Sequence, residues 1–401
     1  MGSEGVPWAA AGDNLWKKIL EHNKVLSKQP GGDQGRPDAN LYIVGSRGYG
    51  KSTMLNRLLY PDKVDVPRST EGMEYTYARK QVTNDRKDIA HIWELAGSET
   101  LCEEVTASEN LFLGMRQVAT AVVCILVDLS KPSEVLESLE FWLNKIKTKC
   151  ATTYDKLERR GSKLPDQLKM RAKKVFGPQH EDKDAVQHTG VSLVIIATKY
   201  DTFRDVDAEV RKIMSRTLRY YAHLNGASLL YLGGLGSQRN VSPKDAPEYK
   251  ALLQNFRSLV NHLIFAGPDR KILSKLNIEI DHMRPLVIPA GHDKFKDIGR
   301  PKGDRGADAI AEWRAVFQKL FPPTKKEEEK EWTFDQAQYA EPTVDAVVSQ
   351  KLAEVTAYKK QLEASAADAR MQAALRQKQL AAKQQQRKAA PPTSRPPPGR
   401  S

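Results

Sequence analysis

The sequence has few cysteines, and none of them lies in a pattern typical of a metal site or a disulfide framework. Only Cys102, Cys124 and Cys150 occur in 401 residues, and no two have C-x-x-C spacing. Zinc ribbons and disulfide-stapled folds need paired cysteines, so these fold classes are set aside and a reducing compartment fits. The eight histidines show no metal-ligand spacing either.

Long hydrophobic runs are also missing. The longest mostly apolar run extends from Ala119 to Val127, well short of the roughly 18 residues that a membrane-spanning helix requires. The N-terminus shows no basic–apolar–small signal pattern, and Val6 stands where a myristoylation motif has Ser or Thr. We therefore expect a soluble, intracellular chain without a transmembrane segment.

The body of the chain has little net charge, and the positive excess is concentrated at its C-terminal end. Lys and Arg number 63 against 50 Asp and Glu, a net charge of +13. Residues 343–401 contain 11 basic and 4 acidic side chains, which leaves +6 of the +13 for the first 342 residues. The basic tail lacks interleaved aromatic residues, so we expect no nucleic-acid partner. A solvated helix explains this tail as well as a contact with an acidic protein surface, a partner subunit or lipid does.

The chain does contain an alternation of strand and helix patterns. Strands are predicted at 41–44, 74–82, 89–94, 119–128, 193–198 and 228–232, and helices at 52–59, 133–149, 207–223 and 246–265. Such alternation predicts a mostly parallel sheet flanked by helices, with right-handed crossovers.

The remaining segments divide the chain further. Residues 1–39 are predicted to be an N-terminal helical or flexible segment, and 40–266 the main α/β domain, with a charged insertion at about 151–190. Residues 267–342 carry apolar pieces and are predicted to pack on that domain as a C-terminal extension. Residues 343–401 are rich in Ala, Gln and Lys and predict a basic helical tail ending in a disordered Pro-rich segment. Its apolar positions look too sparse for a heptad seam.

The strongest motif follows the first predicted strand. Residues 45–52 read G-S-R-G-Y-G-K-S, which matches the P-loop pattern G-x-x-x-x-G-K-[ST] at every fixed position. Its glycines let main-chain amides turn toward a phosphate, and the following helix points its N-terminus at the same anion. Lys51 would neutralise the outer phosphates, and the Ser52 hydroxyl would be a ligand of Mg²⁺. The candidate phosphate-binding residues are Gly45, Ser46, Arg47, Gly48, Tyr49, Gly50, Lys51, Ser52 and Thr53.

Two later motifs indicate a guanine nucleotide. Glu94 and Gly97 form E-x-x-G at a strand end, where guanine-nucleotide domains have D-x-x-G facing the metal and the γ-phosphate. Thr198, Lys199 and Asp201 form T-K-x-D at a later strand end, where the carboxylate can accept two hydrogen bonds from guanine and the lysine stem can cover the base. With the P-loop, they predict an α/β, Ras-like P-loop NTPase fold with a C-terminal helical extension. The expected ligand is GDP or GTP with Mg²⁺, and a vestigial pocket is the alternative.

Hydrolysis is poorly supported by these residues. In Ras-type enzymes a glutamine after the D-x-x-G glycine orients the attacking water, and the Ser98 side chain is too short for that geometry. Glu94 is one methylene longer than Asp, which would push its carboxylate toward the magnesium shell. A switch threonine is expected at Thr70 or Thr76. We therefore predict no catalytic residues and no enzymatic role.

Several further segments carry a family resemblance. They are EYTYARK (74–80), DIAHIWELAG (88–97), VDLSKP (127–132), VIIATKYD (194–201), LRYYAHLNGASLLY (218–231) and the LFPP cluster ending at Pro323. With these segments and the P-loop, the chain resembles the light intermediate chains of cytoplasmic dynein, in particular the ciliary dynein 2 form, over about residues 14–342.

The resemblance implies a non-catalytic motor subunit that binds and stabilises the tail of the dynein 2 heavy chain. It implies other dynein 2 subunits and intraflagellar transport trains as partners, with microtubules contacted indirectly, and a role in retrograde transport and cilium assembly. The implied locations are the cytoplasm, the cytoskeleton and the cilium or flagellum, including basal body and axoneme. The alternative reading is a small-GTPase-like signalling switch that binds and slowly hydrolyses GTP.

Overall fold

The structure, a computed structural model, describes most of the chain between Pro37 and Ala389. The described residues are 37–62, 65, 67–81, 87–97, 103, 105–108, 111–235, 245–268, 270, 276–301, 309–323 and 341–389. The predictions for residues 1–36, for Ser98 and for the Pro-rich end fall outside these residues. The chain divides into two units, Met1–Thr324 and Lys325–Ser401, each of which is described by itself.

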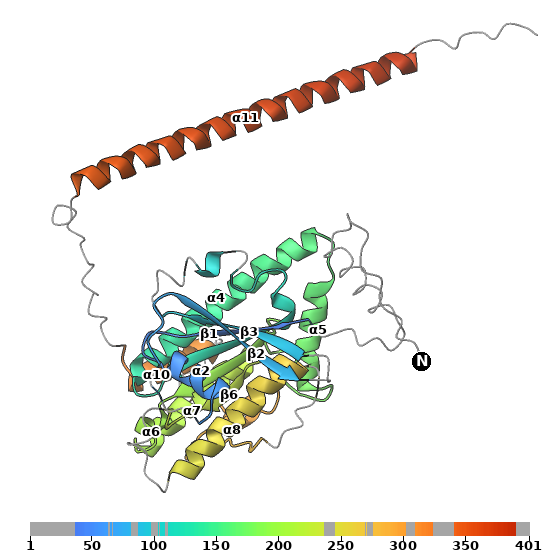
Figure 1. Ribbon diagram of the computed structural model, residues 1–401. Helices are drawn as coiled ribbons and strands as arrows, with labels where there is room; N and C mark the ends of the chain where they lie inside the picture. The colour runs from blue at the N-terminus through green and yellow to red at the C-terminus, as the bar shows by residue number, and fades with distance from the viewer. Residues whose placement is uncertain are drawn as a thin grey trace, which may run out of the picture. The chain divides into compact units, whose positions relative to one another are not determined.

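A seven-stranded sheet forms the centre of the first unit (Figure 1). Its spatial order is β2-β3-β1-β4-β5-β6-β7. The strands are β1 (Ala39–Val44), β2 (Met73–Gln81), β3 (Lys87–Leu95), β4 (Ala121–Asp128), β5 (Ser192–Thr198), β6 (Ser228–Tyr231) and β7 (Val287–Ile288). The five inner strands are parallel, whereas β2 and β7 pair antiparallel at the two edges. The predicted mostly parallel sheet is therefore confirmed.

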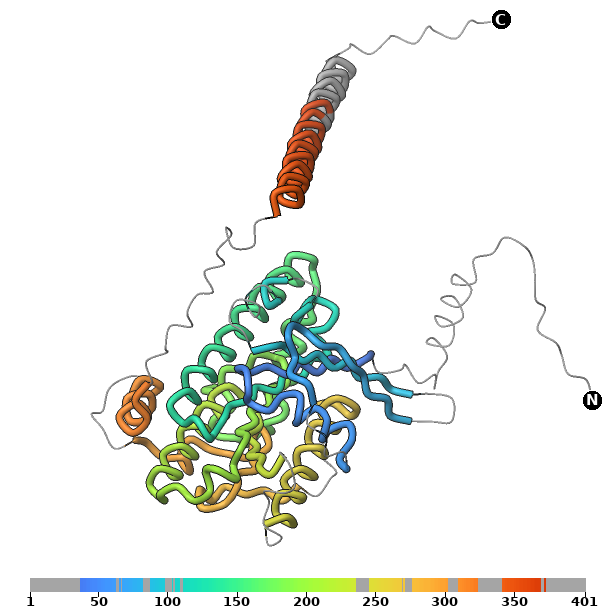
Figure 2. The backbone as a smooth tube through the Cα atoms, turned by 60° about the vertical axis from the view of Figure 1, so that its left-hand side comes forward, coloured from blue at the N-terminus to red at the C-terminus, as the bar shows by residue number. Residues whose placement is uncertain are grey.

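Helices pack on both faces of this sheet (Figure 2). The helices described in this unit are α2 (Lys51–Leu59), α4 (Pro132–Arg159), α5 (Leu164–Phe176), α6 (Tyr200–Phe203), α7 (Ala208–Leu224), α8 (Ala246–Asn261), α9 (Phe295–Ile298) and α10 (Ala309–Leu320), with a 3-10 turn at Val118–Thr120. Every residue of β1 and β4 is buried, as expected for strands covered on both faces, which read as continuous apolar runs.

One predicted helix end was wrong. Helix α4 continues ten residues past Lys149 to Arg159, because buried Cys150, Tyr154 and Leu157 extend its apolar face by further turns. The charged stretch 151–190 thus holds the end of α4 and the whole of α5, followed by a loop. The helix predicted over residues 246–265 is present: α8 ends at Asn261, and residues 262–266 continue it as a π-helix.

The segment after α8 adds strand β7 and helices α9 and α10 to the first unit. Strand β7 pairs with β6. Helix α10 buries Trp313 and Phe317, and its Arg314 donates to the Glu140 carboxylate of α4 at 2.8 Å. Trp313 lies against Tyr220 of α7, with ring centroids 5.8 Å apart.

The second unit contains one long helix, α11 (Pro342–Ala389). Its first half carries exposed apolar side chains: Val344, Val347, Val348, Leu352, Val355, Tyr358 and Leu362. At about 100° per residue these positions fall within roughly 140° of the circumference, a clearer apolar face than the sequence pattern indicated. Among the described residues, no helix combines the length and the apolar character needed to cross a membrane.

Candidate nucleotide site

The P-loop, residues 45–52, connects β1 to α2. Gly45 has φ +144°, and a Cβ there would lie 2.8 Å from the Leu126 carbonyl oxygen of β4, so only glycine fits. Gly50 has φ +86° and directly precedes the first residue of α2. The loop therefore turns tightly over the strand ends and delivers a helix N-terminus to its concave side, the arrangement that binds phosphate.

Lys51 is held across this loop. Its side chain is buried, and Nζ donates to the carbonyl oxygens of Gly45 at 2.8 Å and Ser46 at 3.0 Å. A buried ammonium is costly unless it is hydrogen-bonded, and these carbonyls supply its partners. The charge is thus already placed at the loop where a polyphosphate would need it.

Ser52, Glu94 and Thr70 meet where the sequence predicts a magnesium ion. The Ser52 hydroxyl donates to Glu94 Oε1 at 2.6 Å and lies 3.3 Å from Thr70 Oγ1. Burial raises the pKa of Glu94, while hydrogen bonds from Ser52 and Thr70 and the charge of Lys51 act in the opposite direction. Thr70, rather than Thr76, is therefore the threonine at this site, since Thr76 lies on β2 opposite Ile92.

These three residues fit a magnesium ion by their chemistry. Mg²⁺ prefers oxygen ligands and is commonly bound by one or two carboxylates together with phosphate oxygens and water. Ser52 would be a direct ligand, with Glu94 in or next to the coordination shell. The longer glutamate side chain reaches the serine hydroxyl itself, so a cation here must replace the hydrogen bond between them.

The E-x-x-G glycine is brought against the P-loop. A Cβ on Gly97 would lie 2.1 Å from the Arg47 nitrogen and 2.3 Å from the Ser46 carbonyl carbon, so no side chain fits. Arg47 and Gly48 themselves are exposed, and Thr53 is half-buried in the first turn of α2. The structure thus joins Glu94 and Gly97 to the loop as the sequence predicts.

The T-K-x-D residues lie at the same end of the sheet, but each makes a contact inside the protein. The Thr198 hydroxyl lies 2.9 Å from the Tyr49 carbonyl oxygen and 3.1 Å from the Val127 carbonyl oxygen and shares its one proton between them, which ties β5 to the P-loop. Lys199 has φ +58° and forms an ion pair with the buried Asp128 carboxylate. Thr198 therefore supports the P-loop and does not face a nucleotide base. The Lys199 ammonium is turned toward β4.

Asp201 remains available to accept hydrogen bonds from a nucleotide base. It is exposed at the start of α6, and its Oδ1 accepts a hydrogen bond from the Gly234 amide at 3.0 Å. Gly233 and Gly234 pack under the ring of Tyr249, and a Cβ on either would lie less than 3 Å from that ring. The loop after β6 therefore fixes the carboxylate from one side.

Sequence reasoning missed two supports of the site. The Tyr49 hydroxyl donates to Glu134 of α4 at 3.1 Å, and burial raises the pKa of Tyr49 to about 12. Asp128 accepts from both the amide and the hydroxyl of Ser130, at 2.9 and 2.6 Å, and also holds Lys199. The D-x-S pattern at the end of β4 could have indicated a supporting role for Asp128. Nothing in the sequence placed Glu134 beside the P-loop.

Comparisons with known proteins agree with this architecture. Residues 40–155 match the family described as Roc, "Ras of Complex, Roc, domain of DAPkinase". A Mus musculus protein named cytoplasmic dynein 2 light intermediate chain 1 is 33% identical over 363 residues, covering 87% of this chain and 95% of the mouse chain. The chain belongs to the cytoplasmic dynein 2 light intermediate chain family.

A second sequence relative supports the same family assignment. The Homo sapiens protein of that name is 33% identical over 361 residues, again covering 87% of this chain and 95% of the human one. A solved structure of the dynein light intermediate chain's conserved domain covers 72% of this chain and 93% of its own, with 14% identity and a TM-score of 0.48. The family resemblance and the Ras-like fold predicted from the sequence are thus confirmed by the sequence relatives and the Roc match.

Proposed function

We propose that this light intermediate chain is a non-catalytic subunit of the dynein 2 motor, which binds and stabilises the heavy-chain tail. The observation that carries the proposal is the match to named dynein 2 light intermediate chains along 87% of this chain and 95% of theirs. This match extends past residues 40–155, which match the Roc family. It therefore includes the region of β7 and α10 as well as the predicted nucleotide-binding domain.

The site supports a structural role better than turnover. Lys51, Ser52 and Thr198 each have a hydrogen-bond partner within the protein. A loop held by its own contacts can stay folded whether or not it releases a nucleotide. We infer that the pocket holds GDP or GTP with Mg²⁺ as a stabilising ligand, with Lys51 and the loop amides on the phosphates and Asp201 on the base.

In cells, this subunit would serve retrograde intraflagellar transport and cilium assembly. Its partners would be the dynein 2 heavy chain, other dynein 2 subunits and transport trains, with microtubules contacted only through the motor. It would be found in the cytoplasm and cytoskeleton and in the cilium, from basal body to axoneme. The docking surface would lie on residues 40–342.

Co-expression with the heavy-chain tail tests the stabilising role. The yield of soluble, monodisperse tail is measured with the full chain, with the Lys51→Ala variant, and with an unrelated Ras-like domain as control. The proposal expects a several-fold higher yield with the wild-type chain than with the control, and the yield with Lys51→Ala shows how much bound nucleotide contributes to that gain. An equal yield in all three samples would reject a stabilising role.

The second candidate, a slowly hydrolysing switch, makes a different prediction. A switch would bind its partner in only one nucleotide state, so that GDP and a non-hydrolysable GTP analogue would give different amounts of complex. The subunit proposal expects equal amounts, because the motor contact is permanent.

A further inference from the structure

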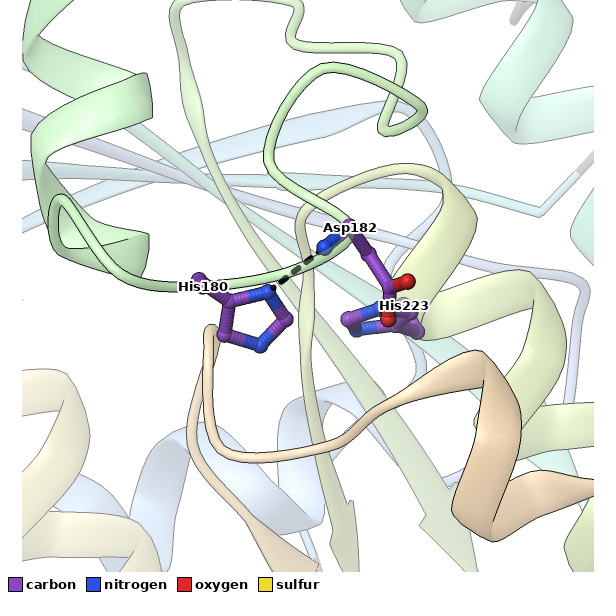
Figure 3. A group of neighbouring side chains, drawn as sticks. All are labelled: His180, Asp182 and His223. Atoms are coloured by element: carbon purple, nitrogen blue, oxygen red, sulfur yellow. Dashed lines mark hydrogen bonds and ion pairs between the residues drawn. The ribbon is translucent and has the colours of Figure 1, made fainter.

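Three potential metal ligands meet on the first unit away from the nucleotide site. His180 and Asp182 lie in the loop after α5, and His223 lies in the last turn of α7. Figure 3 shows the Asp182 carboxylate next to the His223 ring, with His180 beside them. One ligand atom from each residue falls within 4.8 Å of the others, the only such group of three among the described residues.

The carboxylate at the centre of this group is fixed from two sides. Asp182 Oδ2 lies 2.9 Å from His223 Nε2 and accepts a hydrogen bond from the Phe295 amide, also at 2.9 Å. The side chain of His223 is only 1% exposed and that of Asp182 17%. The carboxylate therefore has a fixed position that its neighbours define, unlike an acidic group on an open surface.

The ring of His180 is oriented as a metal ligand usually is. Its Nε2 donates to the Asp293 carbonyl oxygen at 3.0 Å, and its Nδ1 accepts from the Asp182 amide at 3.2 Å, a hydrogen bond that a metal ion on Nδ1 would have to replace. Metal-ligating histidines commonly donate their other ring N–H to a carbonyl or carboxylate, which sets the tautomer and the ring plane. His180 already has that outer partner.

Aromatic rings pack against both imidazoles. Phe176 packs edge-on against His180 and Phe295 against His223, with ring centroids 5.1 and 4.5 Å apart. Two imidazole nitrogens and one carboxylate oxygen are a donor set that suits zinc among the common divalent ions.

We propose that His180, Asp182 and His223 form a Zn²⁺ site that ties the loop after α5 to the end of α7. Zinc–ligand bonds of about 2.0–2.2 Å place tetrahedral ligand atoms roughly 3.3–3.6 Å apart. The contact between His223 and Asp182 must therefore open slightly, and the more distant pairs must close. His223 keeps one proton, which moves from Nε2 to Nδ1 as Nε2 takes the metal, and a water molecule completes the fourth position.

A simple hydrogen-bonded His–Asp pair is the other explanation of the same contacts, and metal titration separates the two. The full-length protein is stripped with a chelator, and Zn²⁺ is titrated in competition with a chromogenic chelator. The proposal expects one Zn²⁺ per chain and a higher unfolding midpoint with zinc than without. His180→Gln and Asp182→Asn should each weaken zinc binding about tenfold or more.

His188→Gln is the matched control, because His188 lies in the same loop but bonds the Lys183 carbonyl at 2.8 Å. It should leave zinc binding unchanged, as should Cys102→Ser, which removes a competing thiol. If a variant unfolds more easily without metal, Co²⁺ absorption of the wild type at stoichiometric loading gives an independent readout, since tetrahedral coordination gives strong visible bands. Absence of stoichiometric binding, or binding unchanged in both ligand variants, would overturn the proposal.

Discussion

The hydroxyl of Ser52 donates a 2.6 Å hydrogen bond to the buried carboxylate of Glu94. This contact joins the last residue of the P-loop to the glutamate of the E-x-x-G motif. Burial raises the pKa of that glutamate, so the folded protein holds its negative charge at a cost, in the place where a magnesium ion would remove it.

The first prediction follows from the sign of that shift. The folded-state pKa of Glu94 lies above its unfolded value, so ionisation destabilises the fold at pH values above the unfolded pKa. Glu94→Gln keeps an acceptor for Ser52 and removes the charge. The variant should be more stable than the wild type at pH 7 without nucleotide, and the difference should shrink toward zero as the pH falls below about 4.5.

Denaturant unfolding over pH 4–8 measures this difference. Glu158→Gln is the control, because Glu158 is exposed on α4, and it should give no such pH-dependent gain. A Glu94→Gln protein less stable than wild type at pH 7 would show that the carboxylate is a net stabilising group.

The second prediction concerns Lys51. Lys51→Ala removes the ammonium that the loop holds for the phosphates, and a charged hydrogen bond contributes about 1.5–3 kcal/mol. Binding of a fluorescent guanine nucleotide should weaken about tenfold or more. Equilibrium titration measures it, with the exposed Lys296→Ala as control. Unchanged affinity would mean that nucleotide binds elsewhere.

Lys51→Ala also decides what the pocket is for. If association with the heavy chain and the unfolding midpoint are both unchanged in the variant, the pocket is a relic. If both fall, bound nucleotide is part of the fold's stability.

The third prediction is that GTP turnover is negligible. Even Ras hydrolyses GTP at only about 10⁻⁴ per second unaided, and the present site has its glutamate bonded to Ser52. Single-turnover hydrolysis by purified protein should not exceed that rate. Rapid release of phosphate in a single turnover would contradict a non-catalytic role.

The fourth prediction tests the packing of α10. Trp313 is 2% exposed and lies against Tyr220, whereas Leu320 on the same helix is 38% exposed. Trp313→Ala should cost about 3 kcal/mol of unfolding free energy, and Leu320→Ala less than about 1 kcal/mol. Chemical denaturation measures both. Equal small losses would mean that α10 does not belong to the folded unit.

The central strands were predictable because their burial on both faces leaves a continuous apolar run, as in β4 and β5. Strand β7 was not, since two residues carry no periodicity and form a strand only by pairing with β6. The end of α4 was missed because charged residues on its outer face mask the apolar positions that continue the helix.

The features of the site likewise divide into those that the sequence predicts and those that only the fold shows. The P-loop lies within eight consecutive residues, so its chemistry is visible in the sequence. The choice of Thr70 over Thr76, and the pairing of Lys199 with Asp128, depend on which strand ends meet in space. His223 is 41 residues from Asp182, so a search for metal spacing along the chain could not find their contact.

Affinity purification from ciliated cells tests the central claim most directly. The tagged full-length chain is recovered and its partners are quantified by mass spectrometry, with a tagged Ras-like domain as control. The subunit proposal predicts that the dynein 2 heavy chain is the main partner in a fixed ratio, with the wild type and under both GDP and GTP-analogue conditions. Recovery of no dynein heavy chain, or of the dynein 1 heavy chain alone, would contradict it.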